Sequence, residues 1–246
     1  MYLKLQKAFA AMIRGTDMHG VLAKSLVLAI SSTLCTLPYF HYLIFEISLK
    51  QRLSESFNPL NLLLTQLLIL FILTLLSAMI GFSFANRYEL PVLGDPRGLM
   101  ASLPLVSGRG ALMIIFSYFL FDRYFLKISP VSYPMDPIFL LSYPFKRAFT
   151  DEVILRFCLV TIAVGLLKSK TAGIILVSVF ASIVSIKYFL FMGIAVRLNY
   201  IFITQFLLGF SANLFLGYLF VTRGLLYSMC LGFLFGMKYL IISLLL

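Results

Sequence analysis

The acidic pair at positions 151 and 152, with the arginine that follows, is the group of side chains in this sequence best placed to do chemistry. Glu152 and Arg156 are four residues apart, so on an α-helix they share a face and can form an ion pair. Asp151 and Glu152 also open an apolar stretch, where the helix dipole favours negative charge. An ion pair that closes a helix end accounts for this spacing. The alternative is that Arg156 orients a carboxylate that activates water as a general base.

The composition places these residues in a membrane protein. Of the 246 residues, 61% are apolar and 12% are charged. Soluble domains have roughly 45–50% apolar and about 25% charged residues, so this chain has too few polar side chains to cover a water-facing surface. The same numbers exclude a disordered chain and a secreted disulfide scaffold. We therefore expect an all-α, polytopic transmembrane helical bundle.

About seven spans are expected, with six or eight as alternatives. A helix needs about 20 apolar residues to cross the hydrocarbon layer. Stretches of this kind or slightly shorter occupy residues 26–47, 60–85, 110–126, 151–167, 173–196, 200–221 and 225–246. Residues 91–110 are interrupted by Pro and Gly and are predicted to be a loop. Residues 130–144 hold four prolines and are predicted to be a loop or re-entrant segment.

Three segments follow from these spans. Residues 1–20 alternate apolar and basic side chains and are predicted to lie as an amphipathic helix on the cytoplasmic face. Residues 21–142 form the N-terminal transmembrane helices and loops, and residues 143–246 form the C-terminal core. No stretch is long and polar enough to form a water-soluble domain.

The formal net charge of +11 is attributed to topology and not to nucleic-acid binding, because the cations lie between the apolar stretches. With the N-terminus inside, the cytoplasmic side carries Lys4, Lys7, Arg14, Lys24, Arg87, Arg97, Arg109, Lys168, Lys170 and Arg223. The other side carries Lys50, Arg52, Lys127, Lys146, Arg147 and Arg197. Ten cations against six favour a cytoplasmic N-terminus and contact with membrane lipids.

Around the acidic pair the chain resembles the CPBP family of intramembrane proteases, which includes the type II CAAX prenyl endopeptidases. The first motif of that family is two adjacent acidic residues, three intervening residues and Arg, and Asp151, Glu152 and Arg156 match it. Residues 173–181 resemble the segment that enters the second motif, and residues 206–224 resemble the hairpin before the third. The resemblance covers about 100 residues, from position 143 onward. It implies a helical protease core in which the glutamate activates water.

The chain departs from that family at both histidine motifs. Aligned on Phe180, the second motif (Phe-x3-His) has Val184 at the histidine position. The third motif (His-x3-Asn or Asp) corresponds to Gly232 and Gly236. The sequence has two histidines, and both precede the acidic pair by more than a hundred residues. Because Val and Gly can neither transfer a proton nor bind a metal, the resemblance implies a protease fold with its chemistry largely removed.

Gly232 and Gly236 have their own interpretation, as a small-xxx-small face that lets a neighbouring helix approach closely. With Phe180 and Val184 we assign them to helix packing and not to a reaction site. Two lysines inside the apolar stretches, Lys187 and Lys238, are candidate partners for the acidic pair; snorkelling to the interface is the alternative.

No cofactor or metal is expected. The three cysteines lie far apart without a C-x-x-C spacing, so they indicate neither a redox motif nor a zinc site.

The first functional hypothesis is a non-catalytic membrane protein on a CPBP-like scaffold, acting as an accessory or assembly subunit or as a binder of hydrophobic segments. Its partners would be lipids and other membrane-protein subunits. The alternative is an active endopeptidase that uses Glu152, oriented by Arg156. A second alternative is a small transporter subunit that uses the embedded lysines and carboxylates, although the sequence shows no internal repeat.

Overall fold

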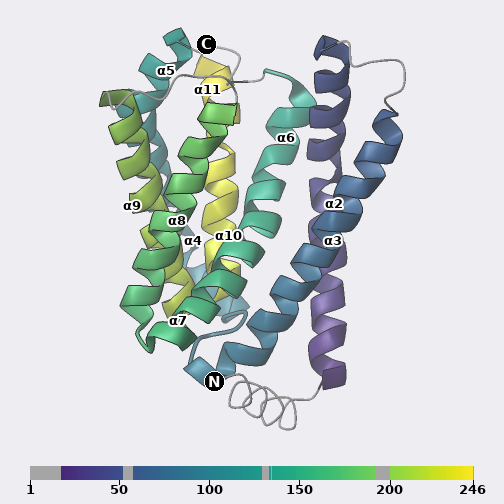
Figure 1. Ribbon diagram of the computed structural model, residues 1–246. Helices are drawn as coiled ribbons and strands as arrows, with labels where there is room; N and C mark the ends of the chain where they lie inside the picture. The colour runs from purple at the N-terminus through teal and green to yellow at the C-terminus, as the bar shows by residue number, and fades with distance from the viewer. Residues whose placement is uncertain (1–17, 52–57, 129–132, 134, 192–199, 246) are drawn as a thin grey trace.

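The computed structural model describes residues 18–51, 58–128, 133, 135–191 and 200–245, and every regular element in these ranges is helical (Figure 1). The elements are α2 (Met18–Gln51), α3 (Pro59–Phe84), a short 3₁₀ turn (Asn86–Tyr88), α4 (Pro96–Ser117), a π-helical turn (Tyr118–Asp122), α5 (Arg123–Ile128), α6 (Pro137–Phe145), two π-helical stretches (Lys146–Asp151 and Val153–Val160), α7 (Thr161–Leu167), α8 (Lys170–Phe191), α9 (Tyr200–Arg223), α10 (Leu225–Gly236) and α11 (Lys238–Leu245). The chain is a transmembrane helical bundle.

Five helices are long and apolar enough to cross a membrane, fewer than the seven expected. They are Met18–Phe45, Pro59–Phe84, Pro96–Lys127, Phe202–Arg223 and Leu225–Leu244. The apolar part of α8, Lys170–Ile186, is shorter. The stretch from α6 to α7 forms one continuous helix, residues 137–167, which we call the central helix. It carries five charged residues near its middle, so its composition alone does not mark it as a span.

Two stretches predicted to be loops begin helices instead. The Asp95 carboxylate accepts hydrogen bonds from the backbone N–H groups of Arg97 and Gly98 at 3.0 and 2.9 Å, and Pro96 occupies the first turn of α4. Asp136 caps α6 in the same way, with Pro137 in the first turn. Asp at the N-cap followed by Pro is a helix start signal, because the side chain satisfies free N–H groups and Pro has none to satisfy.

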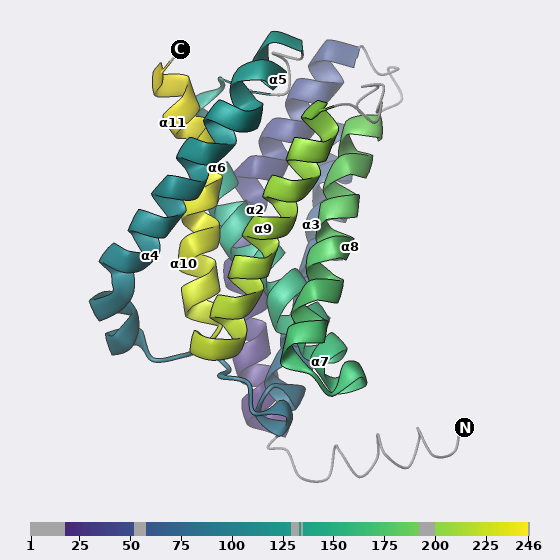
Figure 2. The same cartoon turned by 90° about the vertical axis from the view of Figure 1, so that its left-hand side faces the viewer.

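The central helix lies between two groups of helices. It packs against α2 and α3 on one side and against α8, α9 and α10 on the other. Figure 2 shows α10 between α4 and α9, in agreement with their contacts. The boundary expected between residues 142 and 143 falls inside α6, and helices from both sides of it pack together. The amphipathic segment expected at residues 1–20 lies almost entirely outside the described residues.

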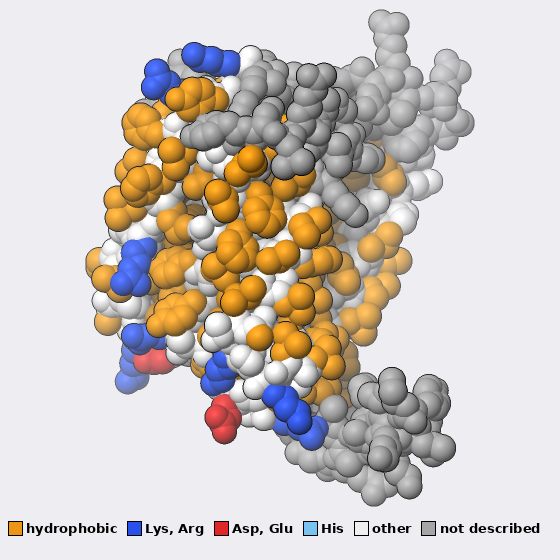
Figure 3. Space-filling view, turned by 60° about the vertical axis from the view of Figure 1, so that its left-hand side comes forward, with side chains coloured by type: hydrophobic (Ala, Val, Ile, Leu, Met, Phe, Trp, Pro, Cys, Tyr) orange, Lys and Arg blue, Asp and Glu red, His pale blue; other side chains and the backbone are white. Residues whose placement is uncertain are grey.

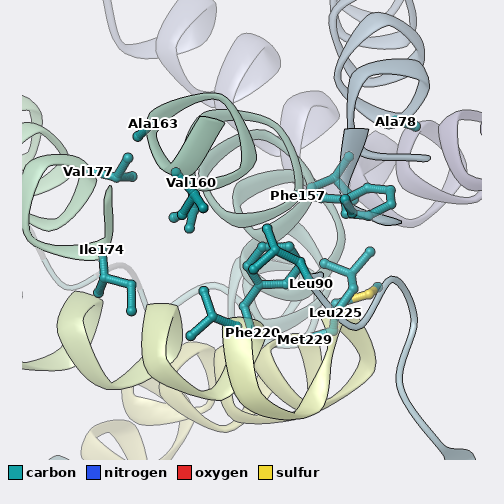
Figure 4. Packing of buried hydrophobic residues seen from close by; sticks show 14 of the residues in the cluster. Ala78, Leu90, Phe157, Val160, Ala163, Ile174, Val177, Phe220, Leu225 and Met229 are labelled. Atoms are coloured by element: carbon teal, nitrogen blue, oxygen red, sulfur yellow. The ribbon is translucent and has the colours of Figure 1, made fainter. Parts of the chain in front are cut away.

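The main apolar core is built around Phe157 of the central helix. Its ring packs edge-on against Phe82 of α3, with ring centroids 4.8 Å apart, and against Phe220 of α9 at 6.2 Å. Figure 4 shows Phe157 near Ala78 on one side and Phe220, Leu225 and Met229 on the other. Gly81 lets α3 approach, because a Cβ there would overlap the Phe157 ring. The described part of the face in Figure 3 is largely hydrophobic, as expected for a bundle in a bilayer. Most of its cations lie toward the upper and lower margins, and one lies at mid-height on the left edge.

The start of α10 is fixed by the loop before α4. The backbone N–H groups of Leu225 and Leu226 donate to the carbonyls of Val92 and Leu93 at 3.1 and 3.0 Å, which satisfies two free donors of the helix. Gly224 turns the chain from α9 into α10 with φ of 104°, a conformation that strongly favours glycine. The two hydrogen bonds and the turn at Gly224 together fix the start of α10, and with it the face of α10 that packs against the central helix.

Candidate functional site

The acidic motif lies where the central helix is wound as a π-helix. Hydrogen bonds from i to i+5 bring side chains five residues apart onto one face, and such turns occur frequently at functional sites. Lys146 Nζ accordingly lies 2.8 Å from Asp151 Oδ1, five residues later. Arg147 Nη1 contacts the other oxygen of Asp151 at 3.1 Å. Asp151 is therefore held by two cations of its own helix.

Glu152 points away from this cluster into the bundle and meets Arg156. The Glu152 side chain is 0% exposed and that of Arg156 is 1% exposed, with Arg156 Nε 3.5 Å from Glu152 Oε2. The ion pair expected from the i, i+4 spacing is therefore present and buried. Arg156 Nη2 also donates to Asn213 Oδ1 of α9 at 2.6 Å. The Asn213 amide in turn donates to the carbonyl of Gly209 at 2.8 Å.

Helix α10 covers the glutamate. A Cβ placed on Gly232 would lie 3.0 Å from Glu152 Cγ and 3.4 Å from the Arg147 carbonyl oxygen. Ser228, one turn earlier, is also buried, and its hydroxyl donates to the Leu225 carbonyl at 3.0 Å. The absence of a side chain at Gly232 thus lets the backbone of α10 lie directly against Glu152. On the other side, Thr150 and Thr36 of α2 share a hydrogen bond of 2.9 Å.

The buried pair is incompletely satisfied. Both carboxylate oxygens of Glu152 and Nη1 of Arg156 are buried without a hydrogen-bond partner among the described residues. A buried charge without hydrogen bonds is costly, so the opposite charge of the partner is what makes each group tolerable here. The pair is also the point where the central helix, α9 and α10 meet.

The remaining residues singled out by the sequence lie elsewhere. Phe180 and Val184 are 51% and 48% exposed on α8, so within the described chain they do not join the packing around Gly232. Gly236 does pack closely, since a Cβ there would overlap the backbone of Pro144. His19 and His41 are both exposed on α2, and His41 stacks on Phe45 of the same helix. The structure brings neither imidazole to Glu152.

Lys238 belongs to a second polar cluster, which sequence reasoning did not predict. It pairs with Asp122, at 2.8 Å, and not with Asp151 or Glu152. Asp122 is 0% exposed and also accepts hydrogen bonds from Ser117, at 2.8 Å, and from Tyr133. Burial, together with the negative charge of Asp122, raises the pKa of the Tyr133 phenol well above its ordinary value. The side chain of the other embedded lysine, Lys187, lies outside the described residues.

The sequence does contain a signal for two members of these clusters, Asn213 and Asp122. Each is a polar residue inside an apolar helix, and a polar group at membrane depth is costly enough to require a partner. Which partner it has depends on contacts between distant segments, and no spacing rule supplies those. In the part of the chain that the structure describes, no three His, Cys, Asp or Glu side chains gather as a metal site requires.

Comparison of the chain with protein-family models, with curated proteins and with solved structures finds no match.

Proposed function

We propose that the protein is a non-catalytic membrane subunit on a CPBP-like helical scaffold, which acts by binding other membrane-protein subunits or hydrophobic segments. The observation that carries this proposal is the burial of Glu152. Its carboxylate is 0% exposed, paired with Arg156 and covered by the backbone of α10 at Gly232. A general base that activates water must lie within hydrogen-bond reach of that water. Glu152 contacts protein instead.

The positions of the histidines support the same proposal. In the protease family that the chain resembles, imidazoles complete the water site next to the glutamate. His19 and His41 are exposed on α2, and the backbone of Gly232 occupies the space beside Glu152. The Glu152–Arg156–Asn213 chain then has a structural role, because Arg156 joins the central helix to Asn213 of α9 and Glu152 lies against Gly232 of α10. Buried polar networks of this kind can fix how helices align.

The endopeptidase remains the second candidate, and one observation favours it. The unpartnered oxygens of Glu152 and Nη1 of Arg156 are buried polar atoms of the kind that occur at reaction sites. A rearrangement of α10 that admitted water would place that water against these atoms.

A cleavage and binding assay on the same preparations separates the two candidates. Wild-type protein and Glu152→Gln are incubated with a fluorogenic prenylated peptide, next to an active protease of the CAAX class. We expect no cleavage by either form, and we expect both to retain the same stoichiometric partner in mild detergent. Cleavage by the wild type that Glu152→Gln abolishes would establish the endopeptidase. Glu89→Gln is the matched control, because it makes the same chemical change at an exposed glutamate outside the acidic motif.

We also propose that the N-terminus faces the cytoplasm. The described end of the bundle that holds Arg87, Arg97, Lys168, Lys170 and Arg223 would then lie on the cytoplasmic side. Single cysteines at positions 168 and 127, introduced into a variant whose three natural cysteines are replaced by alanine, test this with a membrane-impermeant maleimide on intact cells. We expect labelling at position 127 and not at position 168. The reverse pattern would invert the topology.

A further inference from the structure

The bundle contains a lateral cavity, away from the acidic motif, whose lining combines apolar walls with two arginines. The cavity has a volume of about 360 Å³ and lies between α4, α9 and α10. Small-molecule sites in proteins commonly range from about 300 to 1,000 Å³, so this volume is sufficient for a ligand headgroup. Arg109 of α4 and Arg223 at the end of α9 line it. Both side chains are exposed, so the cavity opens to the surroundings of the bundle.

The two guanidinium groups are the charged hydrogen-bond donors of this lining. Three hydroxyls of the lining already donate to backbone carbonyls: Ser102 to Gly98 at 2.8 Å, Thr222 to Tyr218 at 2.7 Å and Tyr227 to Asp95 at 3.3 Å. The phenol of Tyr218 also lines the cavity, where it can donate to an anion beside the arginines. Within the described residues, neither arginine forms an ion pair and no carboxylate lines the cavity. Arg109 is further positioned over the ring of Phe215, 5.7 Å from its centroid. The cavity therefore presents unneutralised positive charge with planar, bidentate geometry, which matches a phosphate group.

The position of Arg109 indicates which kind of molecule carries the phosphate. Arg109 lies within the candidate span Pro96–Lys127, about 20 Å along the helix from Pro96 at 1.5 Å per residue. A cation at that depth is costly unless a partner meets it. Leu105, which is 58% exposed, and the ring of Tyr218, which is 55% exposed, form apolar edges of the opening. Because the surroundings at this depth are apolar, an anion that reaches Arg109 is expected to be part of an amphipathic molecule.

We propose that this cavity binds the phosphate headgroup of an anionic membrane phospholipid, with Arg109 and Arg223 on the phosphate and the acyl chains against the exposed apolar side chains of α4 and α9. Basic pockets between membrane helices are known to hold anionic headgroups. The site is independent of the acidic motif, since none of Asp151, Glu152 or Arg156 lines it.

Native mass spectrometry of delipidated protein tests the proposal. The protein is titrated with phosphatidylglycerol or with phosphatidylcholine that carries the same acyl chains. We expect the wild type to retain phosphatidylglycerol preferentially. We expect Arg109→Ala/Arg223→Ala to lose affinity for it by about 25-fold, at about fivefold for each arginine. Arg87→Ala/Arg97→Ala is the matched control, because these cations are exposed and do not line the cavity. It should change affinity less than about twofold if only lining cations matter.

Two further arms keep the test decisive. Arg109→Lys/Arg223→Lys keeps both charges but not the bidentate geometry, so an intermediate affinity is expected from a protein whose melting temperature matches the wild type. Excess inorganic phosphate should not displace the lipid, whereas short-chain phosphatidylglycerol should. Equal retention of the two lipids by the wild type would overturn the proposal. Equal losses in the lining and control variants would also overturn it, and so would displacement by inorganic phosphate.

Discussion

Arg156→Met is expected to lower the free energy of unfolding by about 3–5 kcal/mol, because it leaves Glu152 as an uncompensated buried charge. Glu152 is fully buried, and Arg156 is the cation that pairs with it among the described residues, so the substitution removes the charge that compensates the carboxylate. The substitution also removes the donor to Asn213 Oδ1. Unfolding by SDS in mixed micelles, followed by circular dichroism, measures the change.

Two matched variants show whether burial of the pair causes the effect. Arg147→Met removes a cation from Asp151, which is 15% exposed and keeps Lys146 as a partner at 2.8 Å. It should cost about 0–1 kcal/mol, as partly exposed ion pairs do. Glu152→Met/Arg156→Met removes both charges and should recover most of the loss, since apolar side chains of similar size commonly replace a buried pair. A double variant as unstable as Arg156→Met alone would show that the pair itself stabilises the bundle.

The helical bundle could be predicted from composition because membrane helices are selected on average apolarity, which the sequence displays directly. The number of apolar spans could not. Charged residues in the middle of the central helix make its composition too polar for an apolar span. In the structure these charges have partners: Asp151 pairs with Lys146 and Arg147, and Arg156 donates to Asn213. Residues 91–110 and 130–144 are predicted to be loops because of their prolines, yet they contain the first part of α4 and most of α6. With Asp before it, Pro starts a helix.

The candidate site divides in the same way between local and distant contacts. The Glu152–Arg156 pair followed from spacing, since a separation of four residues keeps two side chains on one face. The Lys146–Asp151 and Ser117–Asp122 contacts each span five residues, and an α-helical wheel separates such positions. They form because both segments are π-helical, and no local sequence pattern predicts a π-helix at these positions. Asn213 reaches Arg156 across 57 positions, so only tertiary packing could reveal it.

Replacing glycine by alanine at three helical positions is expected to give three different results, because the space beside each glycine differs. At Gly236 a new Cβ would overlap the backbone of Pro144, which cannot move unless α10 separates from α6. Overpacking of this kind costs about 1–3 kcal/mol, so the melting temperature of Gly236→Ala in detergent should fall clearly. Gly232→Ala should fall less, because the atom it meets at 3.0 Å is Cγ of a side chain, Glu152.

Gly108 in α4 is the control for this series, since a Cβ there meets nothing within 4 Å. Alanine loses less backbone entropy than glycine on forming a helix, so Gly108→Ala should keep or raise stability, by about 0.5–1 kcal/mol. The same chemical change should therefore have opposite signs at Gly108 and Gly236. Equal melting temperatures for the two variants would mean that α10 does not pack as closely against α6 as the structure shows. The close approach of Gly232 to Glu152, which buries the carboxylate, depends on the same packing.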